Sequence, residues 1–208
     1  MSDDEELSPP TPLNKPRCQD VRLVETAKSL DEGTIALVAG VGPLAIDAER
    51  ASGFKYSQRA YLIQLHRRNA PILLVDPIAI VEDDPQAFTR LADSIAGLPW
   101  ILHAATQDIP CLAELGLRPS KLIDTELAGR LLGLERVGLG SMVQELLSLA
   151  LAKEHSAADW STRPLPETWL NYAALDVDVL PELAERLLEE LTAADKLSWA
   201  EQEFTHLV

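Results

Sequence analysis

A short apolar run over residues 44–46 is followed by Asp47 and Glu49, two acidic residues separated by a single alanine. Because side chains alternate between the two faces of a strand, a strand over 44–49 would place both carboxylates on one face. Two adjacent anions repel each other unless protons, basic side chains or metal ions compensate their charge. Alone, the segment is compatible with two solvated acids at a strand end and also with a cation-binding site. The rest of the sequence is needed to decide between these two interpretations.

The surrounding sequence predicts an α/β fold with a mixed five-stranded sheet flanked by helices. Besides 44–49, apolar runs at 60–65 and 71–75 predict a hairpin, and two further strands are expected at 100–104 and 122–123. Residues 22–26 are a candidate for an additional short strand. Apolar periodicity and capping residues predict helices over 30–39, 85–96, 108–115, 125–132, 139–150 and 166–191. The first would begin at a capping box formed by Ser29 and Glu32, and the last would bend or break near Pro181.

Length and composition indicate one domain with flanking segments, since 208 residues that are 47% hydrophobic can bury a full core. Residues 1–19 are acidic and contain four prolines, so we expect a disordered tail there. The folded domain is expected over 20–195, and 196–208 would begin a linker toward a further helical domain. No apolar run is long enough to span a membrane, there is no signal-peptide pattern, and the two cysteines have no metal or redox spacing. These features predict a reduced, cytoplasmic protein, which we expect to be monomeric.

The net charge of −15 argues against passive binding of nucleic acid, which normally depends on basic patches. Bound metal ions could still supply positive charge locally.

Three more residues are candidates for the same site as the first two acids. Asp108 follows the expected strand at 100–104, and Tyr172 and Asp176 are four residues apart, on one face of a predicted helix. Each also has an ordinary structural interpretation: Asp108 as a helix N-cap, Tyr172 as a half-buried helix residue and Asp176 as a solvated acid.

Taken in order, Asp47-x-Glu49, Asp108 and Tyr172-x-x-x-Asp176 resemble the pattern of the DEDD exonuclease superfamily, in its tyrosine-bearing branch. The resemblance extends to the ribonuclease D family. Residues 60–65, Ala-Tyr-Leu-Ile-Gln-Leu, resemble that family's second strand, and 159–165, Asp-Trp-Ser-Thr-Arg-Pro-Leu, resemble the loop before its last motif. The similarity spans roughly residues 20–200 and implies a ribonuclease H-like fold. Arg50 is a departure, because many relatives carry an aromatic residue there that packs near the terminal base.

The resemblance implies two divalent metal ions, Mg²⁺ or Mn²⁺, which prefer carboxylate oxygens and support phosphodiester hydrolysis as a pair. In that family's arrangement Asp47 would bridge both ions, Glu49 and Asp176 would complete the ion that activates water, and Asp108 would serve the second ion, directly or through water. Tyr172, with an ordinary pKa near ~10, would orient the nucleophile through a hydrogen bond rather than act as a free base.

Candidate substrate contacts follow from closeness in sequence to these motifs. Arg50, Arg59, Lys153 and Arg163 are expected to contact phosphates, and His103 to lie near the site as a substrate contact or a structural residue. Trp160 would either stack on a base or pack beneath its loop. Arg67 and Arg68 are expected in a solvated hairpin turn.

Two other patterns compete with this assignment. Asp124-Thr125-Glu126 is also Asp-x-Glu, but a helix follows, so Asp124 is predicted to be an N-cap. His103 and Asp108 have the spacing of the histidine-bearing branch, but that assignment would leave the tyrosine motif without a role.

The expected function is that of a metal-dependent 3′–5′ exoribonuclease that releases nucleoside 5′-monophosphates from single-stranded RNA 3′ ends, including tRNA precursors. A DNA-directed exonuclease with the same chemistry remains an alternative. An inactive nucleic-acid-binding module of the same fold is the other, although all four acids are present.

Overall fold

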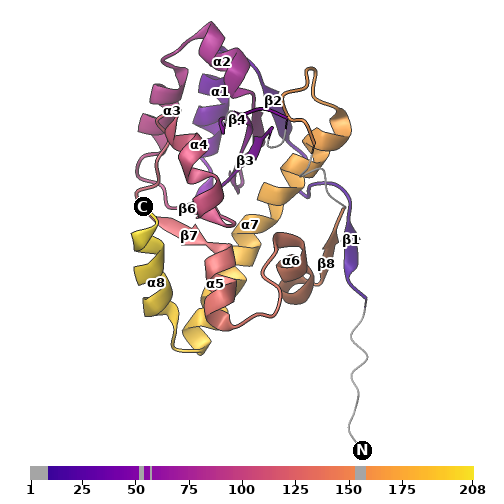
Figure 1. Cartoon of the computed structure of the whole chain (residues 1–208), viewed down its shortest axis with the longest axis vertical. Coiled ribbons are helices and arrows are strands. Elements are labelled where there is room, and N and C mark those ends of the chain that lie inside the picture. The colour runs from indigo at the N-terminus through magenta and orange to yellow at the C-terminus, as the bar shows by residue number, and fades with distance from the viewer. Residues whose placement is uncertain (1–8, 52–53, 57, 153–157) are drawn as a thin grey trace, which may run out of the picture.

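The protein is described by a computed structural model, which covers residues 9–51, 54–56, 58–152 and 158–208. Its centre is a mixed sheet with the strand order β2-β5-β4-β3-β6-β7 (Figure 1). The strands are β2 (Val21–Val24), β3 (Val41–Arg50), β4 (Ala60–Arg68), β5 (Ile72–Val75), β6 (Trp100–Leu102) and β7 (Leu122–Asp124). Strand β4 runs antiparallel to β3 and β5, while β2, β6 and β7 pair in parallel with their neighbours.

The predicted mixed sheet and hairpin are confirmed, but the number of strands in the sheet is six rather than five. The additional strand is β2, which pairs with β5 from Val21–Ile72 to Val24–Val75 and forms one edge.

Helices cover both faces of the sheet. On one face Leu44 and Ile46 of β3 join a core completed by α1 (Ala27–Val38), α2 (Pro77–Asp83), α3 (Ala87–Ile95) and α4 (Ile109–Ala113). On the other face Ala45 packs beneath the long helix α7 (Glu167–Ala193), which continues through Pro181 without a break. Since Asp47 and Glu49 alternate with Ile46, they lie on the α7 side.

A third apolar cluster joins α7 to α5 (Thr125–Leu132), α6 (Leu139–Leu147) and α8 (Leu197–His206), which lie together in the lower part of Figure 1. Ala200 and Phe204 of α8 are buried in this cluster. The segment expected to begin a linker is therefore packed against the domain. No helix of the described residues is long and apolar enough to cross a membrane.

The N-terminal tail needs a correction for its described part. Thr11–Leu13 forms β1, which pairs in parallel with β8 (Leu149–Leu151) as a separate two-stranded sheet. Further along, the backbone N–H groups of Arg17 and Cys18 donate hydrogen bonds to the Asp178 carboxylate of α7, at 2.9 and 3.1 Å. The expected disorder over 1–19 is wrong for Thr11–Leu13, Arg17 and Cys18. Their partners, β8 and Asp178, are distant in the sequence, so no local pattern predicts that these residues are ordered. Residues 1–8 lie outside the described part.

Local signals account for several helix boundaries. Helix α1 begins at Ala27, earlier than predicted, because Thr26 and Ser29 form the capping box in place of Ser29 and Glu32. Helix α6 ends at Leu147 because Ser148 is left-handed, with a φ of 54°, so the chain turns into β8.

Candidate active site

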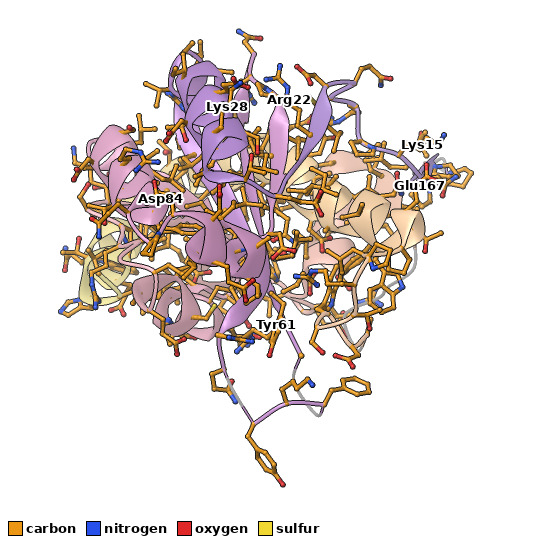
Figure 2. The ribbon with its side chains drawn as sticks, turned by 90° about the horizontal axis from the view of Figure 1, so that it is seen from above. Lys15, Arg22, Lys28, Tyr61, Asp84 and Glu167 are labelled. Atoms are coloured by element: carbon orange, nitrogen blue, oxygen red, sulfur yellow. The ribbon has the colours of Figure 1, made fainter. Side chains whose placement is uncertain are left out.

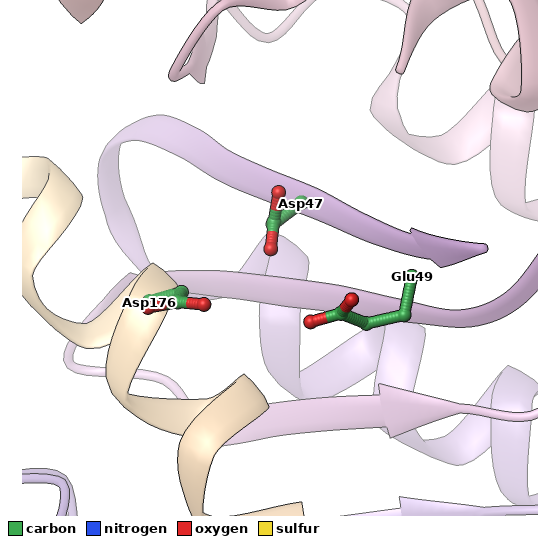
Figure 3. A group of neighbouring side chains, drawn as sticks. All are labelled: Asp47, Glu49 and Asp176. Carbon is green, nitrogen blue, oxygen red and sulfur yellow. The ribbon is translucent and has the colours of Figure 1, made fainter. Parts of the chain in front are cut away.

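Three carboxylates meet where β3 faces α7. One oxygen atom each from Asp47, Glu49 and Asp176 lies within 4.8 Å of the other two. Figure 3 shows the three side chains directed toward one another, two from the strand and one from the helix. Strand alternation and the register of one helix thus bring together residues that are far apart in the sequence.

The carboxylates line a cleft of about 1150 Å³. Asp108, Tyr172, Arg50 and His103 also line it, so it gathers all five predicted catalytic residues and two predicted substrate contacts. The cleft is also lined by residues of α6, its N-cap and β8, whose place at the site the sequence does not predict: Gly138, Leu139, Gly140, Ser141, Gln144, Ala150 and Leu151.

The electrostatics of the cluster show an excess of negative charge. Burial, followed by repulsion from Asp47, Asp176 and Asp108, raises the pKa of Glu49 to about 10. Burial also raises the pKa of Asp47, which nevertheless keeps partial exposure to the cleft. The positive charge of Arg50 opposes both shifts, but it does not overcome them. Oxygen-only ligands with uncompensated charge suit hard divalent cations such as Mg²⁺ or Mn²⁺.

Asp108 lies slightly apart from the three. It occupies the N-cap position of α4, but its side chain makes no capping hydrogen bond, so capping does not explain it. Its carboxylate is buried, 3.8 Å from the Arg50 guanidinium, and burial together with repulsion from Asp47 raises its pKa to about 8.

The turn that precedes Asp108 is stabilised by hydrogen bonds to the Asp124 carboxylate. This buried carboxylate accepts hydrogen bonds from the backbone N–H groups of Ala104 and Ala105, at 3.2 and 2.9 Å, and from Leu127 N–H at 3.1 Å. Ala104 adopts a left-handed conformation with a φ of 56°, which these bonds stabilise. The prediction that Asp124 is an N-cap is confirmed, and the residue also shapes the site.

Tyr172 lies one helical turn before Asp176 and donates a hydrogen bond to its carboxylate. Burial, and then the negative charges of Asp176 and Glu49, raise the pKa of Tyr172 above its ordinary value. The phenol is therefore neutral at physiological pH.

Gln64 is a site residue that the sequence analysis did not single out. It is fully buried on β4, directly opposite Asp47 in the antiparallel register, and its Nε2 lies 3.5 Å from Glu49 Oε1. The signal for it is a polar residue within the otherwise apolar run 60–65, at the position that pairs with the first acid.

The predicted substrate contacts differ in how the structure uses them. His103 lines the cleft, and its Nδ1 lies 2.9 Å from Thr125 Oγ1. Since that hydroxyl donates to Leu102 O, the histidine is assigned the Nδ1–H tautomer. Arg59 places its guanidinium 4.9 Å from the ring centroid of Tyr61. Lys153 lies outside the described residues.

Two of the expected contacts are internal. Trp160 is fully buried, with its ring 5.3 Å from Trp169 and 6.4 Å from Tyr172, so it packs beneath its loop and does not offer a face to a base. Arg163 donates to the buried Asp76 carboxylate at 2.6 Å and to Tyr61 O at 2.8 Å. The guanidinium thus ties the loop to β4 and α2, and a phosphate contact by Arg163 stays a prediction.

The expectation of a solvated position is wrong for Arg67, whereas Arg68 is exposed. Arg67 is buried and donates to Leu37 O and Val38 O, two carbonyls at the end of α1, and to Gly42 O. It therefore donates hydrogen bonds to backbone carbonyls at the C-terminus of α1, where a helix leaves its last carbonyls without partners of its own.

Together, the fold and the site define an α/β domain of the nuclease class, with a carboxylate cluster suited to divalent cations. The family described as 3′–5′ exonuclease matches residues 21–192, so the chain belongs to the 3′–5′ exonuclease family, and it is similar to ribonuclease D proteins. Ribonuclease D of Shewanella sp. (strain ANA-3) is 33% identical over 162 residues, which cover 77% of this chain and 41% of that protein.

Two solved structures are similar to this chain along most of its length. A protein from Bifidobacterium adolescentis is 44% identical with a TM-score of 0.90, covering 95% of this chain and 48% of that one. Escherichia coli RNase D, described as an exoribonuclease involved in structured RNA processing, is 28% identical with a TM-score of 0.75. The match covers 91% of this chain and 50% of that one. The predicted family and ribonuclease H-like fold are confirmed. The chain spans about two fifths of the length of the curated relatives it matches.

Proposed function

We propose that the protein hydrolyses phosphodiester bonds at the 3′ end of single-stranded RNA and releases nucleoside 5′-monophosphates one at a time. The observation that carries this proposal is the group of three carboxylates, from β3 and α7, within 4.8 Å of one another in a large open cleft. Membership of the 3′–5′ exonuclease family supports the direction of degradation, and the ribonuclease D relatives support RNA as the substrate.

Asp47, Glu49, Asp108 and Asp176 are proposed to hold two divalent cations, with Asp47 contacting both. Such cations, when bound, supply the positive charge that an otherwise acidic cleft needs to accept a phosphate and make a water molecule more acidic. The described residues fit this role, because burial and then repulsion from neighbouring acids raise the pKa of Glu49, and a bound cation would favour its charged form.

Tyr172 is proposed to position the attacking water. A neutral phenol can donate one hydrogen bond and accept another, so it can hold a water without removing its proton. Gln64 would keep the Glu49 carboxylate oriented by donating to Oε1. Arg50, which lies 3.8 Å from Asp108, is suited to attract a phosphate while limiting repulsion among the acids.

The finer parts of the proposal concern substrate and location. tRNA precursors are proposed as substrates by resemblance to ribonuclease D. We also propose a cytoplasmic monomer, and the two free cysteines, Cys18 and Cys111, are compatible with a reducing compartment.

The test is to incubate 5′-labelled single-stranded RNA with the protein and Mg²⁺ or Mn²⁺. The expected result is a ladder that shortens from the 3′ end, nucleoside 5′-monophosphate as product, and no reaction with a chelator. Asp176→Asn should be inactive, while Glu203→Gln, which removes one exposed acid on α8, should match the native protein. RNA that stays intact in Mg²⁺ or Mn²⁺ although the protein still binds it would instead support a binding module. Faster turnover of a matched DNA strand would support a DNA-directed enzyme.

A further inference from the structure

The segment that connects β3 to β4 differs in charge from the rest of the protein. Residues 50–59 contain Arg50, Lys55 and Arg59 and no acidic residue, within a chain whose net charge is −15. Two aromatic residues, Phe54 and Tyr56, flank the lysine. The segment is therefore basic and aromatic, which is the composition that single-stranded nucleic acids favour in a protein surface.

Both rings face solvent. Phe54 is 56% exposed and Tyr56 is fully exposed, at 107% of its reference area, whereas Tyr61 at the base of the loop is only 5% exposed. Figure 2 shows the loop next to Tyr61 extending away from the body of the molecule. Leaving two large rings in water forgoes the stabilisation that their burial would provide. Packing within the described part of the chain does not account for their position.

The loop has some internal order. The N–H groups of Phe54 and Lys55 both donate to Ala51 O, at 3.0 and 2.9 Å. At the other end the Arg59 guanidinium lies over the ring of Tyr61. The first two bonds form a turn directly after β3, and the contact of Arg59 with Tyr61 links the loop to β4.

The loop also begins at the cleft. Arg50 lines the cleft and Phe54 follows four residues later, so its Cα lies at most about 14 Å from that of Arg50, and the Cα of Tyr56 at most about 20 Å. One nucleic-acid strand advances about 3.4 Å per stacked nucleotide, so both rings lie within reach of roughly the last six nucleotides.

We propose that Phe54 and Tyr56 form a stacking platform for bases upstream of the 3′-terminal nucleotide of a single-stranded nucleic acid, with Lys55 contacting a phosphate. Every base has a π-face, so the platform would add affinity without selecting a sequence. The inference rests on the proposed function, because it assumes that the 3′ end occupies the carboxylate cleft. The platform gives an acidic protein a cationic, aromatic surface beside its site.

The experiment compares the native protein with the double variant Phe54→Ala/Tyr56→Ala on two substrates, a 12-nucleotide RNA and a dinucleotide. Binding of the 12-mer is measured by fluorescence anisotropy with a chelator, and hydrolysis of both with Mn²⁺. We expect the Kd and KM of the 12-mer to rise about fivefold for each ring removed, the low end of base stacking, while kcat/KM for the dinucleotide is unchanged. Lys55→Gln should reduce the dependence of log K on log salt by about 0.7.

Two variants serve as controls. Trp199→Ala removes a ring that is 59% exposed on α8. It should change neither the Kd and KM of the 12-mer nor kcat/KM for the dinucleotide. Tyr56→Phe retains the ring and should behave as the native protein. All substituted side chains are exposed, so melting temperatures should remain those of the native protein.

The outcomes separate the platform from the proposed function. Unchanged affinity for the 12-mer in the double variant would overturn the inference while leaving the proposed activity intact. Equal losses on both substrates would also overturn it, because they would mean that the loop supports the site itself. If the native protein hydrolyses neither substrate, the proposed function fails, whereas the anisotropy comparison still decides the platform.

Discussion

The substitution Glu49→Gln should stabilise the metal-free protein. Glu49 is 8% exposed, and burial and its three acidic neighbours raise its pKa to about 10, against an ordinary value of 4.5. Between these two values the native state binds more protons than the unfolded state, so this residue's contribution to stability falls as pH rises through that window. Glutamine has nearly the same shape, carries no charge and keeps an Oε1 acceptor for Gln64.

The magnitude follows from the pKa difference. A pH of 7 lies about 2.5 units above the unfolded-state pKa of this carboxyl, which corresponds to at most about 3.4 kcal/mol of destabilisation that the variant removes. For a chain of this size the melting temperature should rise by roughly 7–14 °C. At pH 5.5 the expected gain is only about 1.4 kcal/mol, so the difference between the two proteins should widen with pH.

The assay is a thermal melt of both proteins at pH 5.5, 7 and 8.5, in a chelator and again in Mn²⁺. In Mn²⁺ the native protein should gain more stability than the variant, because stabilisation follows the affinity of the folded state for the ion. Glu203→Gln, an exposed acid on α8, should stay within about 0.5 kcal/mol of the native protein throughout. A variant that melts at or below the native temperature at pH 8.5 in chelator would refute the claim that the cluster holds uncompensated charge.

Three further predictions concern other residues. Asp47→Asn should abolish hydrolysis and the Mn²⁺-induced shift in melting temperature; retention of both would show that Asp47 is not a shared cation ligand. Tyr172→Phe should keep the Mn²⁺ shift and lower kcat by up to about 10²-fold, the lower end for groups that handle protons, and an unchanged kcat would remove its role in water positioning. Arg163→Gln should destabilise the fold by about 2 kcal/mol, measured by urea unfolding, because Asp76 would lose its ion-pair partner while buried.

The parts of the site that local periodicity determines were predictable. Strand alternation placed Asp47 and Glu49 on one face, and helical spacing placed Tyr172 and Asp176 together. Both rules act within one element and do not depend on the rest of the fold. The order of the motifs then supplied the family, which the comparisons confirm.

The parts that depend on contacts between distant segments were not predictable. Arg163 was expected at a phosphate, but its partner Asp76 lies 87 residues away in the sequence. The strand at Thr11–Leu13 exists because β8 pairs with it, and neither segment has a strong pattern of its own. The sequence does not decide whether Trp160 stacks on a base or packs beneath its loop, because the answer depends on the position of α7, which buries it.

The charge of this protein is distributed in a way that bears on how it could bind a polyanion. At the carboxylate cluster, burial and then repulsion among the acids raise the pKa of Glu49 to about 10 and that of Asp108 to about 8. The adjoining segment 50–59 has only positive formal charges. Without cations the buried acids offer a 3′ phosphodiester no compensating positive charge, while the basic loop attracts the strand leading to it. On this arrangement, cation binding would control entry of the 3′ end into the cleft more than overall association, so a chelator should abolish hydrolysis but only partly weaken binding of a long strand.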